Sequence, residues 1–415
     1  MKAYAIIGAG FGDEGKGASV DALVHHLLGR GRRPVVVRAG SGAQAAHTVE
    51  ASGARHVFGH VGSGALLGAP TWFGPRFVHN PPLFLRERDA LRAMGYAPFC
   101  SADPAGAVTL PVDMAVNQAL ERARGADRHG SCGIGFGEAV GRSERAADRI
   151  TVADLHEADR ATLLARVVAV SRACAERRIA ETGLDGEGAA FVRRAARPAL
   201  LDAWLADALR FAALVPPRHA DTLREDHDTV VFEGAQGLLL DRDAAFFPHV
   251  TRSRTGLANV TELVPLIGVT ALEAIHVTRA YATRHGAGPL PGKGLPGPDG
   301  APLVFADPTN GPNAFQGRLR FAPLVPSLLG GAVLHDLATS RSALGAVSLR
   351  SRLAVTCLDQ TEGRALVLRD GRMEAIDVDA LPAALGLAPD EPPWLAHGLA
   401  RDDRPWPAPA LERAA

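Results

Sequence analysis

Short apolar runs separated by longer stretches of mixed polarity dominate the pattern of this chain. The runs that predict buried strands cover residues 4–7, 35–37, 229–232, 275–281 and 354–359. Between them, residues 16–28, 83–94, 113–126 and 152–214 carry apolar side chains at the three- and four-residue spacing of helices. Strands that alternate with helices favour an α/β fold with a doubly wound, mostly parallel sheet. In such folds the loops at the carboxyl ends of the strands form the binding site.

We expect residues 1–415 to form a single domain with three distinctive parts. The Ala/Leu/Arg-rich stretch 152–214 predicts a helical insertion. Residues 286–316 are rich in Gly, Pro and Asn, which is typical of a long mobile loop that closes over substrates. The Pro-rich residues 389–415 predict a tail that runs over the surface.

The composition narrows the class of protein. Apolar residues make up 47% of the chain and charged residues 22%, with a formal net charge of zero and a pI of about 7.3. Nothing in this balance favours a nucleic-acid or membrane partner. Cys100, Cys132, Cys174 and Cys357 show no paired spacing, which indicates reduced thiols in a cytoplasmic protein.

One glycine-rich loop stands out because it contains one of only three lysines, in a chain with 42 arginines. The loop runs Gly10-Phe11-Gly12-Asp13-Glu14-Gly15-Lys16-Gly17 between a predicted strand and a predicted helix. This order is typical of a phosphate-binding loop, in which backbone N–H groups and the lysine bind phosphate oxygens. Gly17 stands where a Mg²⁺-binding Ser or Thr is usual, and Asp13 lies inside the loop. Asp13 is therefore predicted to be a metal ligand, a base for a second substrate, or both.

Six motifs, in this order over residues 3 to about 360, resemble the adenylosuccinate synthetase family. They are Gly12-Asp13-Glu14-Gly15-Lys16-Gly17, Gln44-Ala45-Ala46-His47-Thr48, Phe232-Glu233-Gly234-Ala235-Gln236-Gly237, Phe247-Pro248-His249-Val250-Thr251, Tyr281-Ala282-Thr283-Arg284 and Gly317-Arg318-Leu319-Arg320. The resemblance implies a ligase that joins L-aspartate to the 6-position of IMP, driven by GTP with Mg²⁺. A 6-phosphoryl purine is the implied intermediate.

The resemblance also implies roles for individual residues. Asp13 is the base for the purine N1 proton, His47 the general acid, and Gln236 the residue that holds the purine 6-position. Mg²⁺ is held by Asp13 and the backbone carbonyl of Ala46. The donor phosphates are bound by Gly12, Glu14, Gly15, Lys16, Gly17, His47, Thr48 and Arg320, and the donor base by Asp359. The acceptor nucleotide is bound by Asp13, Lys16, Gln44, His47, Ser131, Gln236, Thr251 and Arg318, and aspartate by Gln316, Gly317, Arg318 and Arg320.

A homodimer is implied as well, because one arginine of the family's nucleotide site is lent by the partner subunit. The spacing leaves two positions open for it, Arg142 and Arg145.

The segments that the resemblance implies for ligand recognition differ from the family's motifs. A Lys-Leu-Asp triplet becomes Cys357-Leu358-Asp359, the loop for the acceptor phosphate becomes residues 129–135 with Ser131 as its hydroxyl, and two threonines become Phe315 and Gln316. These changes leave open a paralogue that uses ATP, or one that acts on dGMP or another heterocycle. A nucleotide-binding regulatory protein without ligase activity and a phosphate-loop kinase are further alternatives. Retention of Asp13, Lys16, His47 and Gln236 argues against a loss of activity.

Overall fold

The computed structural model describes residues 1–51, 53–297, 300–308 and 317–405. Its centre is a nine-stranded sheet with the order β15-β12-β9-β1-β8-β2-β5-β6, in which β7 also pairs with β5. All pairs in this sheet are parallel. The strands are β1 (Lys2–Gly8), β2 (Pro34–Gly42), β5 (Thr71–His79), β6 (Cys100–Ala102), β7 (Ala107–Val108), β8 (Thr229–Glu233), β9 (Ala271–Arg279), β12 (Ser348–Thr356) and β15 (Trp394–Leu395). The predicted doubly wound α/β fold is confirmed.

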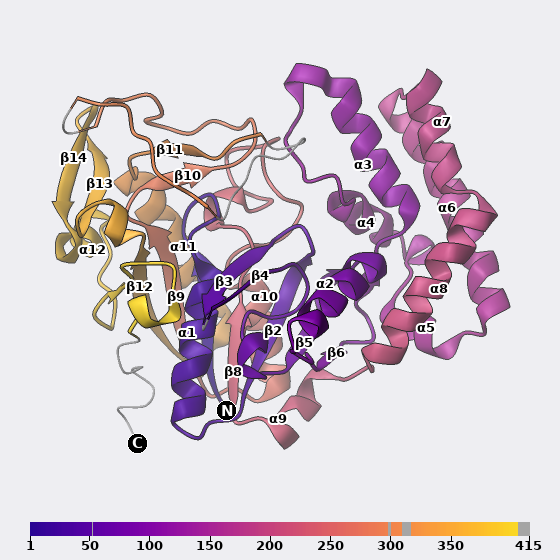
Figure 1. The fold of residues 1–415 in the computed structure, drawn as a ribbon, viewed down its shortest axis with the longest axis horizontal. Helices are drawn as coiled ribbons and strands as arrows, with labels where there is room; N and C mark the ends of the chain where they lie inside the picture. The colour runs from indigo at the N-terminus through magenta and orange to yellow at the C-terminus, as the bar shows by residue number, and fades with distance from the viewer. Residues whose placement is uncertain (52, 298–299, 309–316, 406–415) are drawn as a thin grey trace.

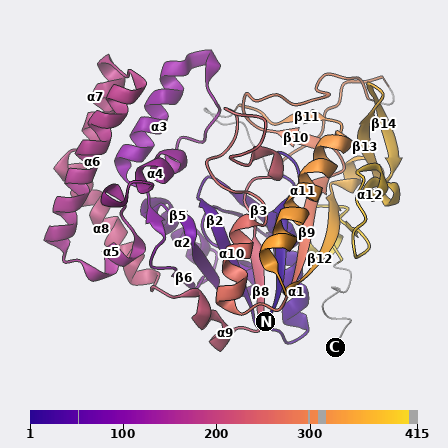
Figure 2. The same ribbon diagram turned by 180° about the vertical axis from the view of Figure 1, so that it is seen from behind.

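Helices cover both faces of the sheet. Helix α1 (Lys16–Gly29) packs on one face in Figure 1, and α10 (Ala258–Ile267) and α11 (Pro326–Leu344) cover the other face in Figure 2. Because both faces are covered, the central strands are buried along most of their length, and every residue of β8 is buried.

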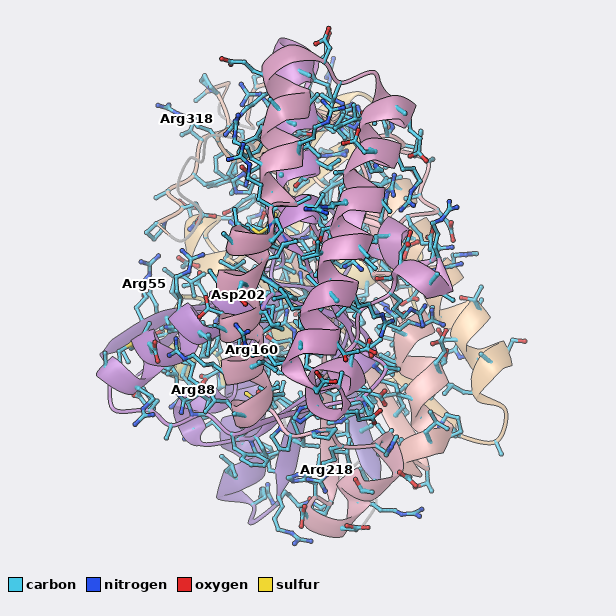
Figure 3. All side chains as sticks on the ribbon, turned by 90° about the vertical axis from the view of Figure 1, so that its right-hand side faces the viewer. Arg55, Arg88, Arg160, Asp202, Arg218 and Arg318 are labelled. Carbon is cyan, nitrogen blue, oxygen red and sulfur yellow. The ribbon has the colours of Figure 1, made fainter. Side chains whose placement is uncertain are left out.

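A helical layer lies beside the sheet, on the right in Figure 1. It contains α5 (Val152–Glu157), α6 (Arg160–Thr182), α7 (Gly186–Ala195) and α8 (Pro198–Leu214), which confirms the predicted helices within residues 152–214. Arg160 of α6 donates a hydrogen bond of 2.5 Å to Asp202 of α8 (Figure 3). The layer shares a hydrophobic core with β5 and α2.

The remaining elements connect these layers. The helices are α2 (Pro81–Ala93), α3 (Pro111–Arg124), α4 (Phe136–Ser143), α9 (Leu223–Asp226) and α12 (Leu381–Ala384). The antiparallel hairpins are β3 (His47–Ala51) with β4 (Ala54–Phe58), β10 (Ala282–Arg284) with β11 (Arg320–Ala322), and β13 (Arg364–Arg369) with β14 (Arg372–Asp377). Short 3₁₀ turns are η1 (Ala65–Leu67), η2 (Gly125–Asp127), η3 (Ala146–Asp148), η4 (Ala220–Thr222), η5 (Leu238–Leu240), η6 (Leu358–Gln360), η7 (Val378–Ala380) and η8 (Arg401–Asp403). No helix in the described ranges is long and apolar enough to span a membrane.

Three boundaries differ from the sequence prediction. Strand β2 continues through Gly42, beyond the predicted run 35–37, because β5 pairs with it as far as that residue. Strand β12 ends at Thr356, and Asp359 lies in the following turn. The tail does not only run over the surface, since Trp394 of β15 is buried at the sheet edge beside β12.

Candidate active site

The glycine-rich loop joins the end of β1 to the start of α1, and neighbouring strands hold it in place. Asp13 adopts a left-handed backbone with φ of 58°, between Gly12 at 86° and Gly15 at 88°. The hydroxyl of Thr356 donates to the carbonyl of Glu14 at 2.9 Å, and the side chain of Arg279 donates to the carbonyl of Asp13. The amides at the start of α1 are therefore fixed for an anion.

Lys16 and Glu14 are both buried within this loop. The Nζ atom of Lys16 lies 3.9 Å from a carboxyl oxygen of Glu14, whose other oxygen accepts from the N–H of Gly10. Burial raises the pKa of Glu14 to about 8 although Lys16 opposes it. Burial also lowers the pKa of Lys16, and Glu14 opposes that shift, so the two groups share one apolar environment.

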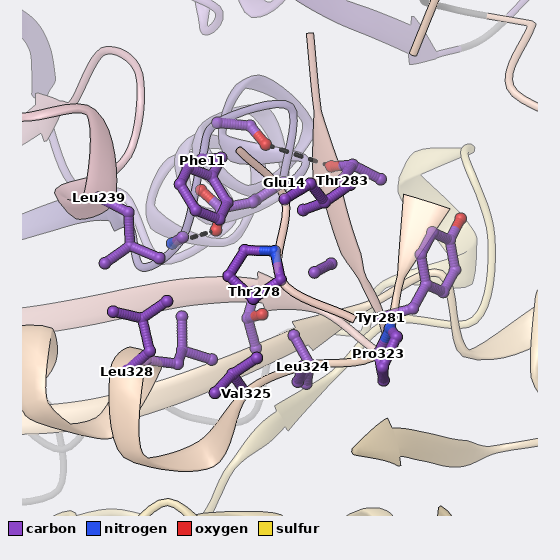
Figure 4. A pocket seen from close by; sticks show the side chains of 16 residues that line it. Phe11, Glu14, Leu239, Thr278, Tyr281, Thr283, Pro323, Leu324, Val325 and Leu328 are labelled. Carbon is purple, nitrogen blue, oxygen red and sulfur yellow. Dashed lines mark hydrogen bonds between the residues drawn. The ribbon is translucent and has the colours of Figure 1, made fainter. Parts of the chain in front are cut away.

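Glu14 also borders a small pocket under the loop (Figure 4). The pocket is lined mainly by apolar side chains, among them Phe11, Leu239, Tyr281 and Leu328. Its apolar lining explains the burial of the Glu14 carboxyl group.

Gln236 follows β8 and faces the loop from the neighbouring strand. Its backbone is also left-handed, with φ of 63°. A methyl group on the next residue, Gly237, would lie 2.3 Å from the carbonyl oxygen of Gly10. The two loops therefore touch backbone to backbone, which brings Gln236 beside Gly12, as a shared site requires.

His47 is the buried partner of a carboxylate. Its Nδ1 atom lies 2.6 Å from Oε1 of Glu233, and its Nε2 atom has no hydrogen-bond partner among the described residues. Burial lowers the pKa of His47. For Glu233, burial alone would raise the pKa, but His47, Arg38 and Ser63 together lower it to about 2. Glu233 and His47 therefore form a short, buried pair, and the second ring nitrogen of His47, Nε2, is left for another partner.

The close packing of His47 also explains the departure at residue 17. A methyl group on Gly17 would lie 2.6 Å from Cβ of His47 and 2.9 Å from Oγ of Ser63. A Ser or Thr would push His47 away from the start of α1.

Asp13 is half-buried, and its carboxylate lies 3.9 Å from Nε2 of His285. His285 follows β10 and was not predicted as a site residue, because it belongs to none of the quoted motif positions.

The other predicted acceptor residues lie on separate loops. Half-buried Gln44 donates to Ser41 at 2.5 Å, Ser131 accepts from Asn117 at 2.8 Å, and Thr251 lies 3.3 Å from Ser253 between their hydroxyl oxygens. Ala46 is exposed and Thr48 is half-buried in β3. The acceptor roles of Gln44, Ser131 and Thr251, the metal role of Ala46 and the donor-phosphate role of Thr48 stay predictions.

The two arginine candidates for the dimer differ sharply. Arg142 is buried, and each nitrogen of its guanidinium donates to Asp113, Val108 or Asp148. This network fixes α4 against α3 and already occupies the Arg142 guanidinium, which favours Arg145 as the candidate; the choice between them stays a prediction. Arg145 has 63% of its side chain exposed, so it is the candidate that a neighbouring subunit can use.

The aspartate candidates lie around the β10–β11 hairpin. Arg320 donates to the carbonyls of Gly286 and Gly288 at 2.5 and 2.6 Å. Gly317 and Arg318 are exposed, and Figure 3 shows Arg318 at the outer edge of its loop. Gln316 lies outside the described residues. Burial and the adjacent Arg320 lower the pKa of Arg284 to about 10, as expected where cations gather without acids.

Asp359 is exposed on η6, one turn beyond β12, and Cys357 just before it is half-buried with φ of 61°. The position of Asp359, near the glycine-rich loop, is compatible with a contact to the donor base. That contact stays a prediction.

Sequence reasoning missed the residues that orient His47. Glu233 lies within a quoted motif but received no role, and Ser63 and Arg38 lie in no motif. A glutamate that ends a wholly apolar strand was the one available signal for Glu233, since a buried acid needs partners.

The two metal ligands predicted from the sequence, Asp13 and Ala46, both offer oxygen atoms. Within the described ranges, no group of three acidic, histidine or cysteine side chains is arranged to hold a metal ion. The Asp13 carboxylate and the Ala46 carbonyl are hard oxygen donors, which suit Mg²⁺ when phosphates supply further oxygens.

The comparisons with known proteins agree with this geometry. A family model described as adenylosuccinate synthetase matches residues 5–297. The adenylosuccinate synthetases of Xanthomonas campestris pv. campestris (strain B100) and Xanthomonas euvesicatoria pv. vesicatoria (strain 85-10) are each 31% identical over 298 residues. The match covers 69% of this chain but only 64% of each relative's length.

Two solved structures share the fold. The fully ligated adenylosuccinate synthetase from Plasmodium falciparum has a TM-score of 0.65 at 15% identity, covering 96% of this chain and 98% of that one. The succinoaminodeoxyadenylate synthetase (PurZ) of cyanophage S-2L, bound to dGMP and to dATP as an energy donor, has a TM-score of 0.56 at 13% identity, covering 97% of this chain and 94% of that one.

Proposed function

The chain belongs to the adenylosuccinate synthetase family, and from this premise we propose that it is a C–N ligase. It joins L-aspartate to the 6-oxo position of an IMP-like purine nucleotide through a 6-phosphoryl intermediate, with GTP as the phosphoryl donor. The observation that carries the proposal is the half-buried carboxylate of Asp13 in the same loop as Lys16, with the His47–Glu233 pair packed against Gly17.

Asp13 takes the N1 proton of the purine, so that negative charge moves to O6, which attacks the γ-phosphorus. A base must reach the heterocycle while it lies beside the phosphate, and a carboxylate inside the phosphate loop meets both requirements. Gln236, on the loop that touches Gly10, holds the purine 6-position through its amide. Mg²⁺, when bound, screens phosphate charge, and Asp13 and the Ala46 carbonyl are the proposed protein ligands.

His47 responds to the charge of the phosphoryl group. In the proposed resting site the Nδ1 atom of His47 donates to Glu233, 2.6 Å away, and Nε2 faces the phosphoryl group. Negative oxygens that approach Nε2 favour a second proton there, and the ionised Glu233 stabilises the resulting imidazolium. His47 then donates to the transferring phosphoryl oxygens, while Lys16 and the loop amides hold the donor phosphates.

Aspartate arrives last and its amine displaces the phosphate at C6. Arg318 and Arg320 are the proposed partners of its carboxylates, since guanidinium groups bind carboxylates in pairs of hydrogen bonds. Arg318 is exposed.

The test is a matrix of phosphate-release assays with purified protein and Mg²⁺. IMP, GMP and dGMP are each combined with GTP or ATP, with and without L-aspartate. The proposal expects aspartate-dependent phosphate release with IMP and GTP, together with a product that contains both aspartate and purine. If none of the nucleotide combinations gave aspartate-dependent phosphate release, the proposed ligase activity would be refuted.

A paralogue that uses ATP, or that acts on dGMP, is the second candidate. Cys357 replaces the lysine of the family's base-reading triplet, and one structural neighbour binds dGMP with dATP as an energy donor. With this candidate, activity in the same matrix would appear with dGMP or with ATP rather than with IMP and GTP.

A further inference from the structure

The C-terminal segment, residues 396–405, lies against helix α1 and beside the glycine-rich loop. The N–H of Leu358 donates to the carbonyl of Ala396 at 3.2 Å, and Ala400 forms a bridge with Glu50 of β3. Arg401 makes two hydrogen bonds, of 2.7 and 2.8 Å, with the buried carboxylate of Asp21 on α1. These contacts tie the segment to the helix that begins at Lys16.

Arg404 at the end of this segment is a buried cation that forms no ion pair with any carboxylate of the described residues. Only 3% of its surface is exposed. Its Nε donates to the carbonyl of Gly398 at 3.0 Å, whereas its Nη1 is buried without a partner in the described part of the chain. No carboxylate oxygen of the described residues forms an ion pair with it within 4.0 Å.

The unpartnered end of Arg404 points at the glycine-rich loop. Its Nη1 lies 3.3 Å from the position that a methyl group on Gly15 would occupy, and Cγ2 of Thr356 is equally close to that position. Gly15 precedes the first residue of α1, where the helix carries its positive end and free N–H groups.

This arrangement is unfavourable without an anion. Arg279 repels the guanidinium, while Asp359, Asp403 and Cys357 attract it from beyond ion-pair distance, and burial lowers the pKa of Arg404. A buried cation beside the positive end of a helix is stabilised when negative charge binds between them.

We propose that Arg404 binds the phosphate chain of the nucleoside triphosphate at residues 10–17. The inference rests on the proposed function only in that this loop binds a triphosphate. Arg404 also places a cation near Cys357, the residue that stands where the family has a lysine.

The experiment is direct titration of the full chain without acceptor nucleotide or aspartate. The probes are GTP, ATP and inorganic tripolyphosphate, each with Mg²⁺. Arg404→Gln is expected to weaken binding of all three by about ten- to a hundredfold, the range for a lost hydrogen bond between charged groups. Arg372→Gln, on the exposed edge of β14, is the matched control and should leave all three affinities unchanged.

Unfolding temperatures separate a ligand contact from a structural one. Without nucleotide, Arg404→Gln should melt at or above the wild-type temperature, because it removes an uncompensated buried charge. With nucleotide, its ligand-induced rise should be smaller.

Three results would overturn the inference: unchanged affinities, loss of GTP and ATP binding with intact tripolyphosphate binding, or a lower melting temperature with intact affinity. A wild-type chain that binds triphosphate but forms no C–N product would instead refute the proposed ligase and leave the role of Arg404 standing.

Discussion

Asp13 combines a functional carboxylate with a backbone conformation that few side chains adopt. Its φ of 58° suits Asp, Asn and Gly better than other residues. Asp13→Asn therefore removes the negative charge and keeps the loop conformation. We expect turnover to fall by about 10²–10⁴-fold, the usual cost of losing a positioned proton-transfer group, with an unchanged melting temperature.

The matched control for this substitution is Asp370→Asn. Asp370 also has a left-handed backbone, with φ of 49°, but it is exposed in the β13–β14 turn. It should keep full turnover in the same phosphate-release assay. An Asp13→Asn variant that retains more than about a tenth of wild-type turnover would exclude Asp13 as the base.

Lys16 has little space around its ammonium group. A methyl group on Gly8 would lie 2.9 Å from Nζ, and Glu14 lies 3.9 Å away on another side. The planar guanidinium of Lys16→Arg does not fit this space, so the variant should lose triphosphate affinity nearly as fully as Lys16→Ala. Titration with GTP and ATP measures this, with Lys2→Arg on β1 as the control. Near-normal affinity of the Arg variant would mean that Lys16 does not contact phosphate.

Residues that act through their neighbours in sequence were predictable, and those that act through distant partners were not. Asp13 and Lys16 lie in one loop whose strand, glycines and helix are all visible in the sequence. The contact of His47 with Glu233 joins residues 186 positions apart. Arg142 was a candidate because sequence spacing does not reveal that Asp113 has already taken its guanidinium.

At the level of elements, β5 and α8 enclose His79. Its side chain makes no hydrogen bond with any described residue. The ring of His79 is buried between Phe73, Phe77 and Phe211, and neither of its nitrogens has a hydrogen-bond partner among the residues that the structure describes. Burial holds the pKa of His79 well below 6.5, so the folded state binds a proton less readily than the unfolded state. The folded state is therefore fully favoured above about pH 6.5 and loses stability as the pH falls below it.

His79→Leu should remove this part of the pH dependence. Between pH 6.5 and 5, one such group accounts for up to about 1.4 kcal/mol of unfolding free energy per pH unit. Urea unfolding at pH 7 and pH 5 should show a smaller loss in His79→Leu than in wild type, whereas exposed His335→Leu should match wild type. Equal losses in all three proteins would contradict the assignment.

Elements with strong local periodicity were predicted well, and glycine-rich boundaries were not. Helix α1 and the helices of residues 152–214 follow from the spacing of their apolar side chains. Strand β2 extends through Gly40 and Gly42 because β5 pairs with them, and no local propensity of glycine reveals this pairing.

At the scale of the whole molecule, exposed Arg145 allows a test of the proposed homodimer. Arg145→Gln and Asp13→Asn should each be nearly inactive alone. If Arg145 acts in the partner's site, an equimolar mixture should recover about a quarter of wild-type turnover, since half of the dimers are mixed and each has one complete site.

A mixture of Asp13→Asn with Lys16→Ala is the control for this complementation. Both changes affect the same loop, so each site of the mixed dimer keeps one defect and no activity should return. Full activity of Arg145→Gln alone would remove Arg145 from the site.

The position of β8 has a consequence for how this chain is made. Strands β1 and β2 are translated early but do not pair with each other, because β8 fills the place between them. At ribosomal speeds of about 5–20 residues per second, roughly ten to forty seconds pass between the end of β1 and the arrival of β8. Through that interval the edges of β1 and β2 that later pair with β8 stay exposed. We therefore expect chaperones that bind emerging polypeptides to bind this nascent chain.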